Sequence, residues 1–169
     1  MLPVYIPLQF INKSINSFEI PITWQIQTII LLTLIFQKEV VLKAFFIYIF
    51  LGLFIVPVFH QGGSIGYLLT PNFGYLLGLY PLIKIIDNLN KRNKINFGNF
   101  LINGFIAIFA LHLTAIIYNF IHVIFFSHLN IFLYNLGKYS LGKIGYHFLM
   151  LLPLLLLIKP IKHFKKSKK

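Results

Sequence analysis

The chain has 169 residues, the length of one domain, and 58% of them are hydrophobic while 11% are charged. Its mean hydropathy of +0.82 lies far outside the range of water-soluble domains. The formal net charge of +12 does not indicate a nucleic-acid partner, because the basic residues cluster beside long apolar runs. Residues 44–83 and 95–137 contain no Lys, Arg, Asp or Glu, and about 20 apolar residues already cross a bilayer. We therefore expect an all-α integral membrane protein with one transmembrane domain over residues 1–169.

The first 21 residues are predicted to be extended or loop-like, because Pro3, Pro7 and Pro21 interrupt them. Five apolar segments after them are expected to cross the membrane as a compact helical bundle, at about residues 22–36, 40–57, 73–88, 100–126 and 146–159. Between the last two segments, residues 127–142 have a mixed composition with Gly137 and Gly142 as helix breakers. That stretch is predicted to be an external loop with at most a short interfacial helix.

The basic residues indicate how the chain is oriented. Nine of the fifteen lie in residues 91–94 and in the tail from Lys159 to Lys169, and short basic clusters beside apolar spans are typical of the cytoplasmic side. Residues 160–169 are then a basic cytoplasmic tail, and the protein is expected to be multi-pass in the plasma membrane. Residues 57–72, residues 127–142 and the N-terminal residues lie outside in this topology and can converge on one mouth.

The stretch Pro57–Tyr80 differs from the rest of the chain because it combines glycines with tyrosines and amides. The tetrapeptide at Gly66–Leu69 returns at Gly74–Leu77. Irregular backbone at membrane depth is tolerated only where protein covers it or where it lines a cavity. One interpretation is a binding site, with glycines for close backbone approach and tyrosines as walls. The other is that glycines and tyrosines serve helix packing and interface anchoring.

The chain lacks the residues that several classes of chemistry need. The histidine pairs His112/His122 and His122/His128 do not have the spacing of metal ligands on one helix face, and no carboxylate lies near them. The chain has three acidic residues, Glu19, Glu39 and Asp87, all expected near the ends of spans, which disfavours proton-coupled transport and paired-carboxylate catalysis. It has no nucleophile elbow and no phosphate-binding loop. We expect no enzyme, no cofactor and no metal, but a passive binding site.

The order of residues in this stretch, PVFHQGGSIGYLLTPNFGYLLGLYP, resembles the central signature of the BioY family, the biotin-specific substrate-binding (S) components of energy-coupling factor (ECF) transporters. The family pattern is Pro-Val-Phe, a Gly-Gly-rich loop and then Pro-Thr-x-Gly-Tyr-Leu-x-Gly-Phe. The corresponding segments here are Pro57-Val58-Phe59, Gly62-Gly63 and Pro71-Asn72-Phe73-Gly74-Tyr75-Leu76-Leu77-Gly78-Leu79. Upstream, residues 21–28 look like the Pro-x-Thr-x-Gln-Thr entry to the family's second helix, so the resemblance covers about Ile20–Tyr80.

The resemblance implies a bundle of six helices with an outward-facing biotin pocket, a transmembrane coupling protein and ATPase subunits as partners, and no catalysis in this chain. Three departures accompany it. The chain offers five clear spans and is expected to lack a counterpart of the first helix. Asn72 stands where the family has Thr. The last-helix motif Pro-Gly-Asp-x-x-Lys of many members, linked to the ligand, is replaced by the stretch Lys143–Phe148, in which Lys143 or His147 is left for a polar role.

Biotin combines a neutral ureido ring, an apolar thioether ring and a carboxylate. Amides suit the ureido ring, tyrosines the apolar ring, glycines close backbone approach, and a lysine the carboxylate. The candidate residues are Gln27, Gln61 and Asn72; Tyr67 and Tyr75; Gly62, Gly63, Gly74 and Gly78; and Lys143. Two alternatives stay open: an S component for another vitamin, and a non-transporting membrane subunit or decayed homologue.

Overall fold

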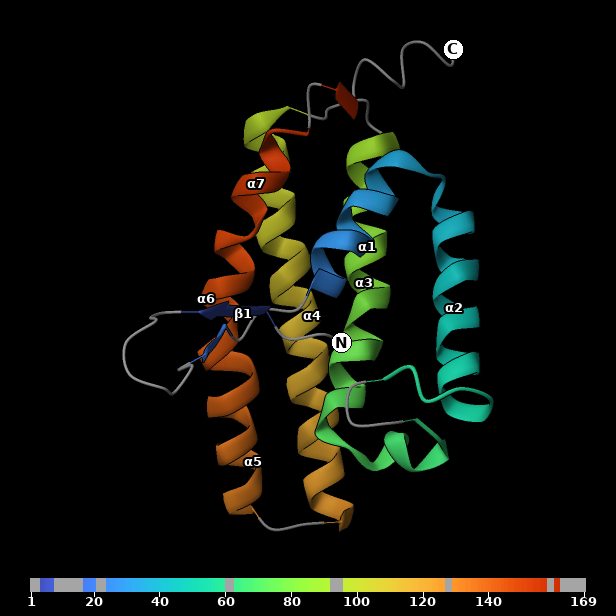
Figure 1. Cartoon of the computed structure of the whole chain (residues 1–169), viewed down its shortest axis with the longest axis vertical. Coiled ribbons are helices and arrows are strands. Elements are labelled where there is room, and N and C mark those ends of the chain that lie inside the picture. Colours follow the sequence, from blue (N-terminus) through green and yellow to red (C-terminus); the bar gives the residue numbers. More distant parts are fainter. Residues whose placement is uncertain are drawn as a thin grey trace.

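The computed structural model describes residues 4–7, 17–20, 24–59, 63–91, 96–126, 129–157 and 160–161 (Figure 1). The elements in chain order are β1 (Val4–Pro7), β2 (Ser17–Ile20), α1 (Trp24–Ile35), α2 (Lys38–Phe54), the 3-10 helix η1 (Ile65–Leu69), α3 (Pro71–Lys91), α4 (Phe97–Phe126), α5 (Leu129–Asn135), the π-helix η2 (Leu136–Leu141), α6 (Gly142–Leu149) and α7 (Leu151–Leu155). The expected helical bundle is present, and four of its helices begin and end within three residues of the segments predicted from apolar runs.

The centre of the bundle is the antiparallel pair α3 and α4, with α1 and α2 on one side and α5 to α7 on the other (Figure 1). Gly74 and Gly78 lie one turn apart on α3 and face α4. A Cβ on Gly74 would stand 2.8 Å from Cβ of Tyr118, and one on Gly78 would stand 2.6 Å from the carbonyl oxygen of Leu111. Small residues four apart allow two helix backbones to approach closely where lipid gives no hydrophobic driving force. This glycine pair sets how closely α3 and α4 pack.

Different parts of the chain lie at the two ends of the bundle (Figure 1). The α1–α2 turn, the C-terminal end of α3 and the end of α7 lie at one end. The 3-10 helix η1, the C-terminal end of α4 and the N-terminal end of α5 lie at the other, which we call the η1 end. The charged turn at Lys38–Glu39 therefore shares an end with Lys91, as the charge pattern predicts.

Residues 129–142 differ from the prediction. The stretch expected as an external loop, with Gly137 and Gly142 as breakers, is helical from Leu129 through η2 into α6, antiparallel to α4. The expected fifth span at residues 146–159 is therefore only the later half of this helical segment, and α7 ends at Leu155. Glycines are compatible with helix here because nearly all backbone groups in lipid must bond within the segment.

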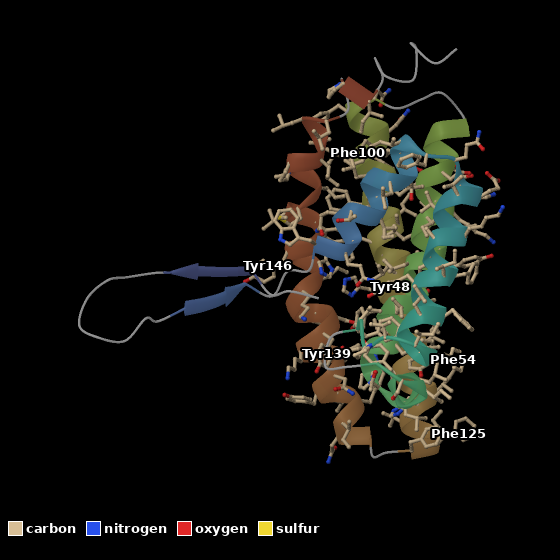
Figure 2. All side chains as sticks on the ribbon, turned by 45° about the vertical axis from the view of Figure 1, so that its right-hand side comes forward. Tyr48, Phe54, Phe100, Phe125, Tyr139 and Tyr146 are labelled. Atoms are coloured by element: carbon tan, nitrogen blue, oxygen red, sulfur yellow. The ribbon has the colours of Figure 1, made fainter. Side chains whose placement is uncertain are left out.

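The N-terminal residues form a hairpin where an extended or loop-like segment is predicted. Val4 pairs with Ile20 and Pro7 with Ser17 in antiparallel register, so that the extended backbone bonds to itself. This hairpin is an exception to the expected all-α fold. It projects from the side of the bundle near α6 and does not join the connections at the η1 end (Figures 1 and 2).

The outer faces of the helices are apolar. Among the described residues α4, with 30 residues, is the one helix long and apolar enough by itself to cross a membrane, and α1 is a shorter apolar helix. Large apolar side chains that remain exposed include Phe46, Ile47, Phe50 and Phe54 on α2 and Ile102, Phe105, Phe109, Leu113 and Ile117 on α4. Exposed apolar side chains in this number on α2 and α4 are typical of a surface that lipid or a protein partner covers.

Candidate functional site

The interior of the bundle contains a histidine pair at about the middle of α4. His112 on α4 and His147 on α6 are 2% and 3% exposed, and Nε2 of His112 lies 3.0 Å from Nδ1 of His147. The two outer ring nitrogens, Nδ1 of His112 and Nε2 of His147, are buried and find no hydrogen-bond partner among the described residues. Buried polar atoms are almost always paired in native proteins, so these two atoms need a partner that the described residues do not supply.

Tyr75 links this pair to α3 and η2. Its ring meets the ring of His112 edge-on, with centroids 5.6 Å apart and planes at 79°. Its hydroxyl shares a hydrogen bond with the Ser140 hydroxyl, which is buried in η2. The tyrosine of the glycine-rich motif is thus held from two directions, with its ring against a histidine and its hydroxyl against the π-helix.

The π-helix η2 separates α5 from α6 and carries Tyr139 and Ser140. It begins beside Gly137 and is followed by Gly142, where a Cβ would lie 3.1 Å from the carbonyl oxygen of Gly137. The wider π turn changes which side chains face the bundle, and single π turns within α-helices often occur at functional sites. Here the turn directs Ser140 toward Tyr75.

Lys143 is a cation close to this group. It lies on α6 one turn before His147, and its Nζ is 5.4 Å from the centroid of the Tyr139 ring, a distance at which a cation and an aromatic face attract. Its ammonium is also near enough to interact electrostatically with His112 and His147. The structure therefore brings two predicted residues, Tyr75 and Lys143, into one neighbourhood.

Gln27 is the most deeply buried of the predicted amides. It lies in the first turn of α1, which packs on α3, and is 4% exposed. Neither its Oε1 nor its Nε2 has a hydrogen-bond partner among the described residues. Two further amide atoms in the interior are in the same situation, Oδ1 of Asn119 on α4 and Nδ2 of Asn135 on α5. The bundle thus holds several polar groups that the described part of the chain does not satisfy.

Tyr67 belongs to an aromatic wall at the η1 end. Its ring lies 4.5 Å from Phe59 at 31° and 6.4 Å from Phe73 at 83°. Burial raises the pKa of Tyr67 to about 12, with smaller contributions from the nearby hydroxyls of Tyr48 and Tyr139. The Tyr67 hydroxyl therefore keeps its proton at physiological pH, and its proximity to Tyr139 connects the aromatic wall with the π-helix.

The predicted glycines have packing contacts. Gly74 and Gly78 face α4, and a Cβ on Gly63 would stand 2.6 Å from both the Gly52 carbonyl oxygen and the Pro57 Cα. Each of these three approaches backbone or a neighbouring helix. This matches the interpretation of the motif as a packing device.

Asn72 lies half-buried in the first turn of α3, and the predicted residues Gln61 and Gly62 lie outside the described residues. Among the described residues, no three of His, Cys, Asp and Glu come together in a way that would hold a metal ion.

Sequence reasoning named His147 as a candidate for a polar role, but it missed the pairing of His147 with His112, and it missed Tyr139 and Ser140. His112 and His147 are 35 positions apart on antiparallel helices, so spacing along the chain does not associate them. The available signal was the position of His112 within a long uncharged run, since polar residues at membrane depth mark functional sites more often than not.

Comparison with known proteins identifies the family of this sequence. The sequence model of the BioY family matches residues 4–153. A protein of Lysinibacillus sphaericus named "Probable biotin transporter BioY" is 37% identical over 95 residues, which are 54% of this chain and 48% of that protein. The match thus spans about half the length of this curated relative. No solved structure matches the chain.

Proposed function

This chain belongs to the BioY family, and on that premise we propose that it is the membrane-embedded subunit that captures biotin outside the cell for ATP-driven uptake by an ECF-type transporter. Biotin is carried here as a transported ligand and undergoes no reaction, so the chain acts as a transporter component and not as an enzyme. The name of the Lysinibacillus sphaericus relative supports biotin as the substrate.

The observation in the fold that carries this proposal is the set of buried polar atoms without partners. Gln27 leaves both amide atoms unsatisfied, and the outer nitrogens of His112 and His147 are unsatisfied as well. Leaving such atoms unpaired costs about 1–3 kcal/mol each. A ligand with several donors and acceptors around an apolar ring, such as biotin, offsets that cost on binding, while Tyr67 and Tyr75 supply aromatic contact area.

We assign the direction of capture from charge. The end of the bundle with Lys38 and Lys91 is cytoplasmic in this proposal, as is the C-terminal tail, and the η1 end faces outward. The chain carries no nucleotide-binding motif, so energy for release must come from partner subunits. A transmembrane coupling protein and ATPase subunits are the partners that family membership supports.

The proposal is tested with purified protein in detergent and radiolabelled biotin. We expect saturable binding with sub-micromolar affinity, displaced by unlabelled biotin and not by thiamine or riboflavin. Displacement by one of those vitamins instead of biotin would assign the chain to another vitamin. Folded protein that binds none of them would contradict the proposal.

A substitution at Gln27 gives a sharper test because its amide is unsatisfied in the bundle. Gln27→Met has nearly the same volume and no polar atoms. It should leave the unfolding temperature unchanged or higher, while the free energy of biotin binding weakens by about 1–3 kcal/mol. Thr33→Val on the same helix is the matched control, since the Thr33 hydroxyl bonds within α1 to the Ile29 carbonyl. A Gln27→Met protein that is less stable and binds biotin normally would show that the amide serves the fold.

A further inference from the structure

We propose that the His112–His147 pair recognises the ureido ring of biotin, and that Lys143, one turn nearer the η1 end than His147, binds the biotin carboxylate. This inference rests on the proposed function. The two outer ring nitrogens of the pair are buried without a partner among the described residues, and they come from two helices, α4 and α6.

The hydrogen bond between the rings determines what the pair offers. In an uncharged pair, one of the two inner nitrogens donates to the other, because a neutral imidazole has one N–H and one lone pair. If Nε2 of His112 donates, its Nδ1 is an acceptor and Nε2 of His147 carries a proton. If the bond runs in the opposite sense, the two outer roles exchange. In either tautomer the pair presents one donor and one acceptor.

A ureido ring is the group that matches this pattern, since it carries N–H donors beside a C=O acceptor. A carboxylate does not match it, because an ionised carboxylate accepts only and would leave one outer nitrogen unpaired. Both histidines are at most 3% exposed, and an unpaired charge at such depth is far more costly than a neutral polar group with partners. The pair therefore selects the neutral end of the ligand.

The order of side chains along α6 and η2 places the two ends of the ligand. Tyr139, Lys143 and His147 follow at intervals of four residues, and the chain runs away from the η1 end from α5 toward α7 (Figure 1). The Lys143 ammonium lies 5.4 Å from the centroid of the Tyr139 ring, and the Lys138 ammonium lies 5.3 Å from the same centroid. Figure 2 places Tyr139 on the half of this helical segment nearer α5. The ureido ring is then deepest and the carboxylate is nearer the outward end, where desolvation of a charge costs less.

The experiment measures the affinities of three ligands for the purified full chain. Biotin is compared with biotinamide, which lacks the carboxylate charge, and with 2-iminobiotin, whose ring carbonyl is replaced by an imine nitrogen. The variants are His112→Phe, His147→Phe, His147→Gln and Lys143→Gln. His122→Gln is the matched control. Nδ1 of His122 is also buried without a partner among the described residues, but His122 lies ten residues further along α4, about 15 Å from His112, with its ring on Phe126.

We expect each Phe variant to lose at least tenfold in affinity for biotin and biotinamide alike, and His147→Gln to lose less, because an amide keeps a donor and an acceptor. The Phe variants should also discriminate less between biotin and 2-iminobiotin than the wild-type chain does. Lys143→Gln should lose at least tenfold for biotin and nothing for biotinamide. His122→Gln should bind all three ligands like wild type.

The outcomes separate this inference from the proposed function. If the folded wild-type chain binds no biotin, the proposed function fails. A second outcome is that the wild-type chain binds biotin. If the folded histidine variants then keep the wild-type affinity for biotin and the wild-type discrimination against 2-iminobiotin, the histidine assignment is overturned. Should the Phe variants not fold, imidazole nitrogen-15 NMR of the wild-type chain decides. Biotin must then shift the Nδ1 resonance of His112 and the Nε2 resonance of His147, and unchanged resonances would overturn the assignment.

Discussion

Replacing Gly78 by Ala tests whether the glycines of the motif serve helix packing or ligand approach. The new Cβ would stand 2.6 Å from the carbonyl oxygen of Leu111 and 3.0 Å from its Cα. Ordinary contact begins at 3.4 Å, so α3 and α4 must separate locally by about 0.8 Å, and backbone atoms cannot move aside as a flexible side chain can. Overpacking of this kind costs about 1–3 kcal/mol. It works against the gain of about 1 kcal/mol that Ala brings over Gly in a helix.

Gly145→Ala is the control, since Gly145 lies in α6 and a Cβ there meets nothing within 4 Å. We expect Gly145→Ala to leave the free energy of unfolding unchanged or raise it, and Gly78→Ala to lower it relative to that control by about 1–3 kcal/mol. Equilibrium unfolding in mixed micelles, followed by circular dichroism, measures both. If Gly78→Ala is as stable as Gly145→Ala and only its biotin affinity falls, the packing argument is refuted and the glycine lines the ligand site.

Three other predictions concern the side chains of Tyr75, Tyr67 and Phe59. Tyr75→Phe should lower the free energy of unfolding by about 0.5–1.5 kcal/mol, because the hydrogen bond to Ser140 is lost. Adding Ser140→Ala to this variant should lower the free energy of unfolding little further, which a double-mutant cycle measures. Folding raises the pKa of Tyr67 from 10.0 to about 12, so the Tyr67 hydroxyl loses its proton at lower pH in the unfolded chain than in the folded one. The free energy of unfolding should therefore fall as pH rises from about 10 to 12, and it should fall less in Tyr67→Phe. Phe59→Ala should destabilise the bundle by about 3–5 kcal/mol, because the Phe59 ring fills the space over Gly52, whereas Phe59→Leu should lose less in the same unfolding assay.

Helix positions could be predicted well from the sequence because apolar runs of membrane length leave few alternatives for the backbone. The prediction was wrong at residues 129–142, where Gly137 and Gly142 were interpreted as breakers. Their role in water, where solvent competes for freed backbone groups, does not carry over to a segment packed against α4. The π turn between them is a consequence of packing that no local pattern predicts.

The candidate site could be predicted only in part. Tyr75 and Lys143 were predicted as site residues, and the structure places both beside the π-helix, Tyr75 against Ser140 and Lys143 against Tyr139. Gln27 was identified and is buried with its amide unsatisfied. The histidine pair depends on the register of α6 against α4, and register is set by contacts between distant segments. A residue's type can be read from the sequence, but its partner across the bundle cannot.

The two interpretations of the motif concern different faces of one helix. Successive residues of an α-helix are separated by about 100°, so Gly74 and Gly78 share a face against α4 while Tyr75 points to the side. The contact of Gly78 with Leu111 fixes the height of α4 against α3, and the next residue along α4 is His112, whose ring meets Tyr75. Close packing at the glycines is therefore what places the tyrosine against the histidine pair. It follows that a substitution such as Gly78→Ala should weaken biotin binding through displacement of His112, and that the loss should be smaller in a chain that already carries His112→Phe.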